Sequence, residues 1–204
     1  ACGSGAAAIG AASTAFGGGA QAIESGTVAF GNNAVANANF ATAIGSSSEA
    51  SGTWSVALGD SATSSEFGAI ALGTSSLATG QFSTATGVNS EATGENSMAL
   101  GGFLGISSTN LDRFRFTLAP AARAIAVGPA AQVHADEGVA MGAKTRVLAG
   151  ADRAIALGSD SIASETDTVS FGHLATELDF SGTVFGSDLQ RRLINVADGI
   201  GDHD

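Results

Sequence analysis

Residues 55–59 read Ser55-Val56-Ala57-Leu58-Gly59, and close variants of this five-residue word return about every fourteen residues along the chain. The glycine that ends each copy shows the period most clearly. It stands at Gly17, Gly31, Gly45, Gly59, Gly73, Gly87 and Gly101, and after a break at Gly128, Gly142, Gly158, Gly172 and Gly186. Twelve copies at a nearly fixed spacing are typical of a solenoid, in which each repeat buries its surface by stacking on its neighbours.

The residues before each glycine alternate in size. The position directly before it is bulky and apolar in eleven of the twelve copies, and the position before that is alanine in ten of them. Successive side chains of a β-strand point to opposite faces, so Val56 and Leu58 share one face while Ala57 lies on the other. The word therefore predicts a short strand with one bulky apolar face and one very small face.

A second small word completes each repeat, as in Ala34-Val35-Ala36 and Ser76-Leu77-Ala78. Its flanking Ala and Ser are small enough to face the alanines of the first strand across a thin interior. Glycines such as Gly52 and Gly80 follow in the return turn, where a positive φ is expected. We therefore predict an all-β, parallel β-roll solenoid of about twelve 14-residue coils, each with two short strands and two tight turns.

The bulky face of the first strand would form a continuous apolar stripe. Twelve rungs at a spacing of roughly 4.8 Å give it a length of about 55 Å. Monomers seldom expose more than a few hundred Å² of contiguous apolar surface, so we expect copies of the chain to cover the stripe around a closed cyclic axis. The predicted contacts include Val56, Leu58, Ile70, Leu72 and Leu100.

The words 55–59, Ala69-Ile70-Ala71-Leu72-Gly73 and Ser97-Met98-Ala99-Leu100-Gly101 resemble the head repeats of the YadA-like trimeric autotransporter adhesins. The resemblance runs from about Ala12 to the end of the chain, apart from an interruption at about 102–123. It implies a left-handed parallel β-roll that assembles as an obligate homotrimer. It also implies attachment of bacteria to host cells, extracellular matrix proteins, cell-surface receptors or other surfaces.

The resemblance further implies a head exposed on the bacterial cell surface and joined to the outer membrane only through an anchor outside this sequence. Residues 190–199, Gln190-Arg191-Arg192-Leu193-Ile194-Asn195-Val196-Ala197-Asp198-Gly199, resemble the neck that leads from such heads into a coiled-coil stalk. The implied division is therefore head repeats over 1–186 and the start of a neck over 187–204. In this reading Arg191, Arg192 and Asn195 bind the three chains together.

Two breaks interrupt the period. The step from Gly101 to Gly128 is 27 residues, and the additional segment contains Arg113-Phe114-Arg115-Phe116. Insertions into solenoids often carry the binding face, so these four residues are candidates for contact with a host ligand. Alternating Phe residues are usually buried, however, and a hairpin that packs on a neighbouring chain is the other interpretation. A smaller step of 16 residues, from Gly142 to Gly158, predicts a bulged turn.

Composition excludes several classes of partner. The 204-residue chain has a formal net charge of −11, and Lys144 is its only lysine. Because a surface that binds phosphates needs clustered cations, we expect no nucleic acid partner. The single cysteine, Cys2, excludes an internal disulfide framework, and no apolar run reaches the length of about 18 residues that a transmembrane helix requires.

The sequence shows no motif for catalysis. His134, His173 and His203 are far apart, and no Gly-x-Ser-x-Gly elbow or phosphate-binding loop is present. We therefore predict that the chain is not an enzyme and binds neither a metal nor a cofactor. An acyltransferase of the left-handed β-helix type would show a hexapeptide period. An ice-binding or other non-catalytic β-solenoid is the alternative function, but regular ranks of Thr-x-Thr are missing.

Overall fold

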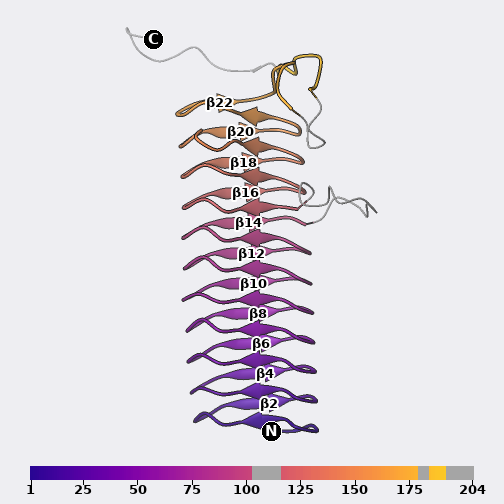
Figure 1. Cartoon of the computed structure of the whole chain (residues 1–204), viewed down its shortest axis with the longest axis vertical. Coiled ribbons are helices and arrows are strands. Elements are labelled where there is room, and N and C mark those ends of the chain that lie inside the picture. The colour runs from indigo at the N-terminus through magenta and orange to yellow at the C-terminus, as the bar shows by residue number, and fades with distance from the viewer. Residues whose placement is uncertain (103–115, 179–183, 192–204) are drawn as a thin grey trace, which may run out of the picture.

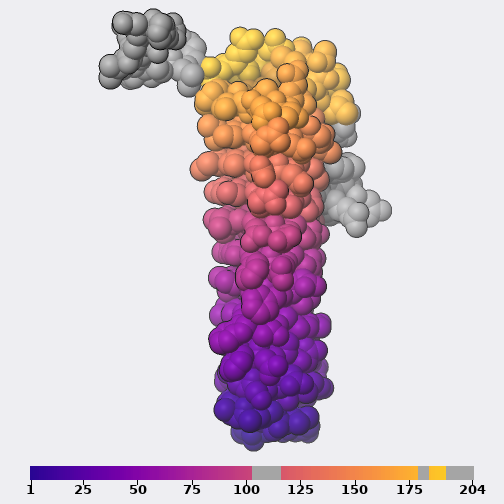
Figure 2. Space-filling view, turned by 90° about the vertical axis from the view of Figure 1, so that its left-hand side faces the viewer, coloured from indigo at the N-terminus to yellow at the C-terminus, as the bar shows by residue number. Residues whose placement is uncertain are grey.

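The computed structural model describes residues 1–102, 116–178 and 184–191, which wind into one long β-solenoid (Figure 1). Twenty-two short strands form two parallel sheets of eleven strands each, and successive strands alternate between the sheets. Each coil thus gives one strand to the even-numbered sheet and one to the odd-numbered sheet. The space-filling view shows the resulting narrow rod (Figure 2). Within the described residues, no helix has the length and hydropathy of a membrane span.

The strands are very short in both sheets. Those of the even sheet are β2 (Thr14–Phe16), β4 (Val28–Phe30), β6 (Thr42–Ile44), β8 (Val56–Leu58), β10 (Ile70–Leu72), β12 (Thr84–Thr86), β14 (Met98–Leu100), β16 (Ile125–Val127), β18 (Val139–Met141), β20 (Ile155–Leu157) and β22 (Val169–Ser170). Those of the odd sheet are β1 (Ala7–Ala8), β3 (Gln21–Ala22), β5 (Val35–Ala36), β7 (Glu49–Ala50), β9 (Thr63–Ser64), β11 (Leu77–Ala78), β13 (Glu91–Ala92), β15 (Leu118–Ala119), β17 (Gln132–Val133), β19 (Arg146–Val147) and β21 (Ile162–Ala163). The all-β parallel solenoid predicted from the repeat is confirmed.

The pairing register follows the sequence period. Ile70 pairs with Val56 and with Thr84, so each step between neighbouring rungs is fourteen residues. Across the first break Leu100 pairs with Val127, and across the second Val139 pairs with Ile155. The additional residues therefore lie between strands, and the rungs on either side keep their alignment. The first interruption falls between β14 and β15, and the second between β19 and β20.

Alanine fills the interior. Ala57 and Ala71, at the centres of β8 and β10, are fully buried, as are Ala62, directly before β9, and Ala78, in β11. The largest fully buried side chains are Val133 and Val147. The predicted thin interior of small residues is therefore confirmed, and each coil buries little apolar area of its own.

The glycine that closes each word is required by both backbone conformation and space. Gly59 has a φ of 142°, and a Cβ added there would lie 2.5 Å from the carbonyl oxygen of Gly73 on the next coil. Real Cβ atoms do not approach a backbone oxygen so closely, and L-residues seldom adopt this φ. The stacking of coils at strand spacing therefore explains why the period is marked by glycine rather than by another small residue.

The twelfth copy of the word does not form a rung. Residues 184–186 are Val184-Phe185-Gly186, and Val184 pairs with Leu178 in an isolated antiparallel bridge instead of joining the even sheet. The preceding copies place alanine, or Ser170 in β22, at this position, where the interior accepts only a small side chain. Valine is larger than either, but the chain has already left the solenoid before this copy, because the odd sheet ends at β21 and the even sheet at β22. The sheets therefore have eleven rungs where the repeat count predicted about twelve.

Candidate functional site

One candidate surface is an apolar stripe on the outer face of the even sheet. It consists of the two outward side chains of each rung, and Leu58 is 47% exposed although it is a large hydrophobic residue. Val56, Ile70, Leu72 and Leu100 lie on the same face and are partly exposed. The structure thus brings the five predicted stripe residues together on one surface, and their contact with other chains remains a prediction.

The stripe changes character along the rod. At its first rungs the rings of Phe16 and Phe30 stack with centroids 4.9 Å apart and planes 7° apart. Aliphatic residues follow, and β12 then presents Thr84 and Thr86 side by side. Among the described rungs this is the one with a polar residue at both outward positions. A surface that packs against copies of itself would therefore contain one polar layer within an apolar column.

Two other predicted sets fall mainly outside the described residues. Arg113, Phe114 and Arg115 of the candidate ligand-binding group lie there, while Phe116 is half-buried just before β15. Arg192 and Asn195 of the predicted neck contacts also lie outside. The two interpretations of the 102–123 segment therefore remain predictions, as does the division into head and neck.

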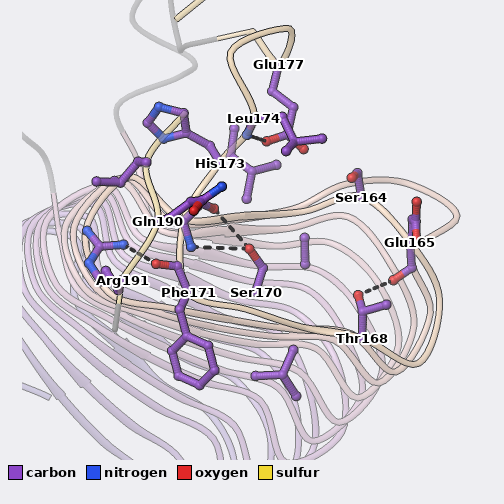
Figure 3. Close-up of a pocket in the computed structure, with 15 residues that line it drawn as sticks. Ser164, Glu165, Thr168, Ser170, Phe171, His173, Leu174, Glu177, Gln190 and Arg191 are labelled. Atoms are coloured by element: carbon purple, nitrogen blue, oxygen red, sulfur yellow. Dashed lines mark hydrogen bonds between the residues drawn. The ribbon is translucent and has the colours of Figure 1, made fainter. Parts of the chain in front are cut away.

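Arg191 closes the C-terminal end of the solenoid. Its guanidinium donates hydrogen bonds to Phe171 O at 2.7 Å and to Ser161 Oγ at 2.8 Å, and it also donates to Ser159 O. Figure 3 shows this side chain beside Phe171, to which it is hydrogen-bonded. The guanidinium therefore satisfies oxygen atoms that have no further coil to bond to. Its predicted contact with neighbouring chains remains a prediction.

A cavity of about 410 Å³ lies beneath this closing segment, between the last rung and residues 171–177 and 189–191 (Figure 3). His173 borders it, but Nδ1 of the ring lies 3.0 Å from Asp160 O and the ring stacks on Phe185 with centroids 3.6 Å apart. The backbone of His173 also bonds to Leu189 in both directions. Within the described residues, no cluster of three or more His, Cys, Asp or Glu side chains could hold a metal. His173 is thus held by a polar contact and a ring contact within the segment that covers the last coil.

One surface was not singled out from the sequence. We define the aromatic edge as Phe40, Trp54, Phe67 and Phe82, which lie in the turns that lead from the odd sheet into the even sheet. All four are large hydrophobic residues between 42% and 57% exposed. The signal was present in the period, because positions 40, 54, 68 and 82 are spaced by fourteen residues and three of them are aromatic.

Ion pairs occupy the same edge in the second half of the rod. Arg123 bonds to Glu137 at 2.8 Å, and Arg153 bonds to Asp167 through two hydrogen bonds of 2.6 and 2.8 Å. The side-chain hydrogen bond from Arg153, and then the charge of its guanidinium, lowers the pKa of Asp167 below its ordinary value. Charged residues therefore neutralise one another from coil to coil where aromatic residues stand in the first half.

The repeats of this chain are similar to those of known proteins. The family model described as "YadA head domain repeat (2 copies)" matches residues 22–48, 50–76, 78–103, 119–145 and 149–175, well over half of the chain. A solved structure described as the collagen-binding domain of the Yersinia adhesin YadA is similar with a TM-score of 0.47 and 23% sequence identity, over 98% of this chain and 80% of that chain. No curated protein matches the sequence.

Proposed function

The chain belongs to the family of YadA head domain repeats, and on this basis we propose that it is the head of a trimeric adhesin that attaches bacteria to host cells, extracellular matrix or other surfaces. The family is structural and non-catalytic, in agreement with the prediction that the chain is not an enzyme. The observation that carries the proposal is the apolar stripe, because one copy of the chain leaves it uncovered.

A homotrimer would bury the apolar stripe that a single chain leaves exposed. The interior of each coil is filled mainly by alanine, serine and threonine, while the Val, Leu, Ile and Phe residues of the even sheet point outward. Burying such residues contributes about 25 cal/mol for each Å² removed from water. Three copies arranged about one axis would bury all three stripes at once, since a closed cyclic assembly leaves none of them exposed.

A trimer would strengthen adhesion through multivalent binding. A rigid rod held at the bacterial surface presents the same outer face three times, and linked weak contacts hold a cell more strongly than one contact does. The position at the bacterial surface and the attachment to the outer membrane are part of this proposal. The net charge of −11 per chain favours solubility of such an exposed assembly.

The mass of the purified chain in solution tests the assembly. We expect a trimer for the unchanged chain, and we expect Leu72→Glu to abolish it because a carboxylate would be buried in the stripe. Leu77→Glu is the matched control, since Leu77 lies in the neighbouring odd-sheet strand with its side chain partly exposed on the opposite face. A monomer at micromolar concentration, or a trimer that tolerates Leu72→Glu, would contradict the proposal.

Attachment needs a separate measurement. The purified chain should bind to host cells or to immobilised matrix proteins, and the trimeric form should be retained longer than a monomeric Leu72→Glu variant because of avidity. Equal retention of the two forms would contradict the role given to the trimer. Loss of attachment with Leu77→Glu, at full trimer content, would instead place the contact on the odd sheet.

A further inference from the structure

The aromatic edge is a regular feature of the backbone. Phe40, Trp54 and Phe82 have φ values of 60°, 63° and 56°. This left-handed region is uncommon for residues other than glycine, and it is a genuine outlier for bulky residues, whereas Asn and Asp are enriched in it. One coil after Phe82 the equivalent position is Asn96, with a φ of 55°. The turn therefore favours a small polar residue, and three aromatic residues occupy it without being buried.

The rings form two contacting pairs. Phe40 and Trp54 stack with centroids 4.4 Å apart and planes 19° apart, while Phe67 and Phe82 meet edge to face at 5.3 Å. Gly68 leaves room for the ring of Phe82, since a Cβ added at Gly68 would lie 2.9 Å from Cδ1 of Phe82. Aromatic contacts of this kind contribute only about 0.5–1.5 kcal/mol each. They offset part of the cost of the unusual φ but leave the outer surface of the rings in water.

The backbone holds this surface rigid. The amide of Trp54 donates to Asn39 O at 3.0 Å, and the amide of Phe82 donates to Phe67 O at 2.9 Å. These bonds continue the ladder between coils through the turn. A ligand that binds there meets a backbone already fixed in place, so binding requires little loss of backbone conformational freedom.

The charge around the aromatic edge is of one sign. Residues 1–102 contain six carboxylates and no Lys, Arg or His. Three of the six, Glu24, Glu66 and Glu95, lie in turns of this kind and are exposed, and Glu66 and Glu95 stand directly before Phe67 and Asn96. On the same edge of the second half, Arg123 and Arg153 pair with acidic residues of the next coil. The first half therefore combines exposed aromatic faces with carboxylates that no cation of those coils can pair.

We propose that the aromatic edge, Phe40, Trp54, Phe67 and Phe82 together with Glu66 and Glu95, is a docking surface for a basic segment of a partner protein. Arginine and lysine are attracted to the faces of aromatic rings, most strongly to Trp, and carboxylates supply the complementary charge. An anionic partner would be repelled by the same residues. The inference rests on the proposed adhesive function, because it names the chemical class of partner that the head recognises.

Trp54 provides a direct measurement, since it is the only tryptophan and the chain contains no tyrosine. The probe is a short oligoarginine peptide, added to the intact chain while the fluorescence of Trp54 is recorded. We expect saturable quenching with oligoarginine and none with oligoglutamate. Quenching by a neutral oligosaccharide in place of oligoarginine would overturn the proposal, as would a concentration dependence showing that a second copy of the chain covers Trp54.

Variants separate ring contacts from simple attraction between charges. Phe82→Asn places a residue favoured at this φ, so the turn is kept, and we expect affinity for oligoarginine to fall about fivefold, as a cation–π contact of about 1 kcal/mol implies. The affinity of the Trp54→Asn variant for oligoarginine, measured by calorimetry, should fall at least as far. Val88→Asn is the matched control, because it removes an exposed apolar residue from the other turn of the coil.

Glu66→Gln and Glu95→Gln should weaken binding and reduce its dependence on salt, because each removes a charge from the site. Binding that is unchanged by Trp54→Asn and Phe82→Asn would overturn the proposal, even if it remained sensitive to salt. Solution mass is recorded for the same samples. A trimer that attaches to cells but ignores oligoarginine would refute the docking surface alone, whereas a monomer would refute the trimeric head.

Discussion

Gly138 lies against Val133 in the interior of the solenoid: a Cβ added at Gly138 would be 2.7 Å from Cγ1 of Val133 and 3.1 Å from Cγ1 of Val147. Preceding coils place Ala, Ser or Thr at the position of Gly138, and Ala or Ser at those of the two valines. One glycine thus compensates for the two largest fully buried side chains, and the interior keeps its width.

This compensation predicts that a destabilising substitution at Gly138 can be relieved by a second substitution at Val133. Gly138→Ala should lower the free energy of unfolding by roughly 1–3 kcal/mol, because it overpacks a filled interior. Adding Val133→Ala should recover part of the loss, since it removes the atom that the new methyl group would meet. Denaturant unfolding of the two single variants and the double variant gives the coupling. Strictly additive losses would mean that the two residues do not compensate for each other.

The closing glycines predict a difference between two turns. Gly59→Ala meets the carbonyl of the next coil, whereas Gly150 also has a positive φ, of 84°, but nothing within 4 Å of an added Cβ. Gly150→Ala should therefore lose only about 1 kcal/mol, from backbone strain, and Gly59→Ala should lose clearly more. Thermal and denaturant unfolding measure both. Equal losses would show that φ alone, and not contact between coils, fixes the period.

The polar layer of β12 predicts an increase in stability. In the proposed trimer, Thr84→Val with Thr86→Leu would replace hydroxyl groups by apolar atoms inside the shared stripe, which should stabilise the assembly by roughly 1 kcal/mol or more per chain. The midpoint of thermal unfolding should rise. Thr63→Val, on the outer face of the odd sheet, is the control and should have little effect. A lower midpoint for the double variant would place β12 outside the interface.

The pair Arg153 and Asp167 predicts a dependence on pH. The pKa of Asp167 is lowered from an ordinary value of 3.8, so its contribution is present above that pH and is lost as the pH falls through the lower value of the folded state. Arg153→Ala should raise the pKa of Asp167 in an NMR titration. Arg123→Ala, on the same edge but bonded to Glu137, should leave it unchanged.

The closing role of Arg191 predicts a local effect. Arg191→Ala removes its hydrogen bonds to the last coil, so amides of β20 and β22 should exchange with solvent faster while those of β8 do not change. Hydrogen exchange with mass spectrometry measures this difference. Exchange that rises equally along the whole rod would contradict a role confined to its end.

Periodicity made most of the fold predictable. Gly59 and Ala57 have equivalents in nearly every copy, and one position of each repeat has one environment throughout the rod. The end of the solenoid was less predictable, because Gly186 continues the period in the sequence although the even sheet ends at Ser170. The aromatic edge was missed because its residues do not recur in every copy. Trp54 and Gly68, for example, occupy the same position of two neighbouring repeats. Only the coordinates show that the rings of the aromatic edge stay exposed.

The register across 101–127 has a consequence for how such rods change length. Because each coil bonds only to the one before it and the one after it, whole coils or long loops can be gained without altering any other interface. Each added coil extends the rod by about 4.8 Å. In the proposed adhesin, duplication of a short gene segment would thus adjust the distance at which a cell is held in small, uniform increments.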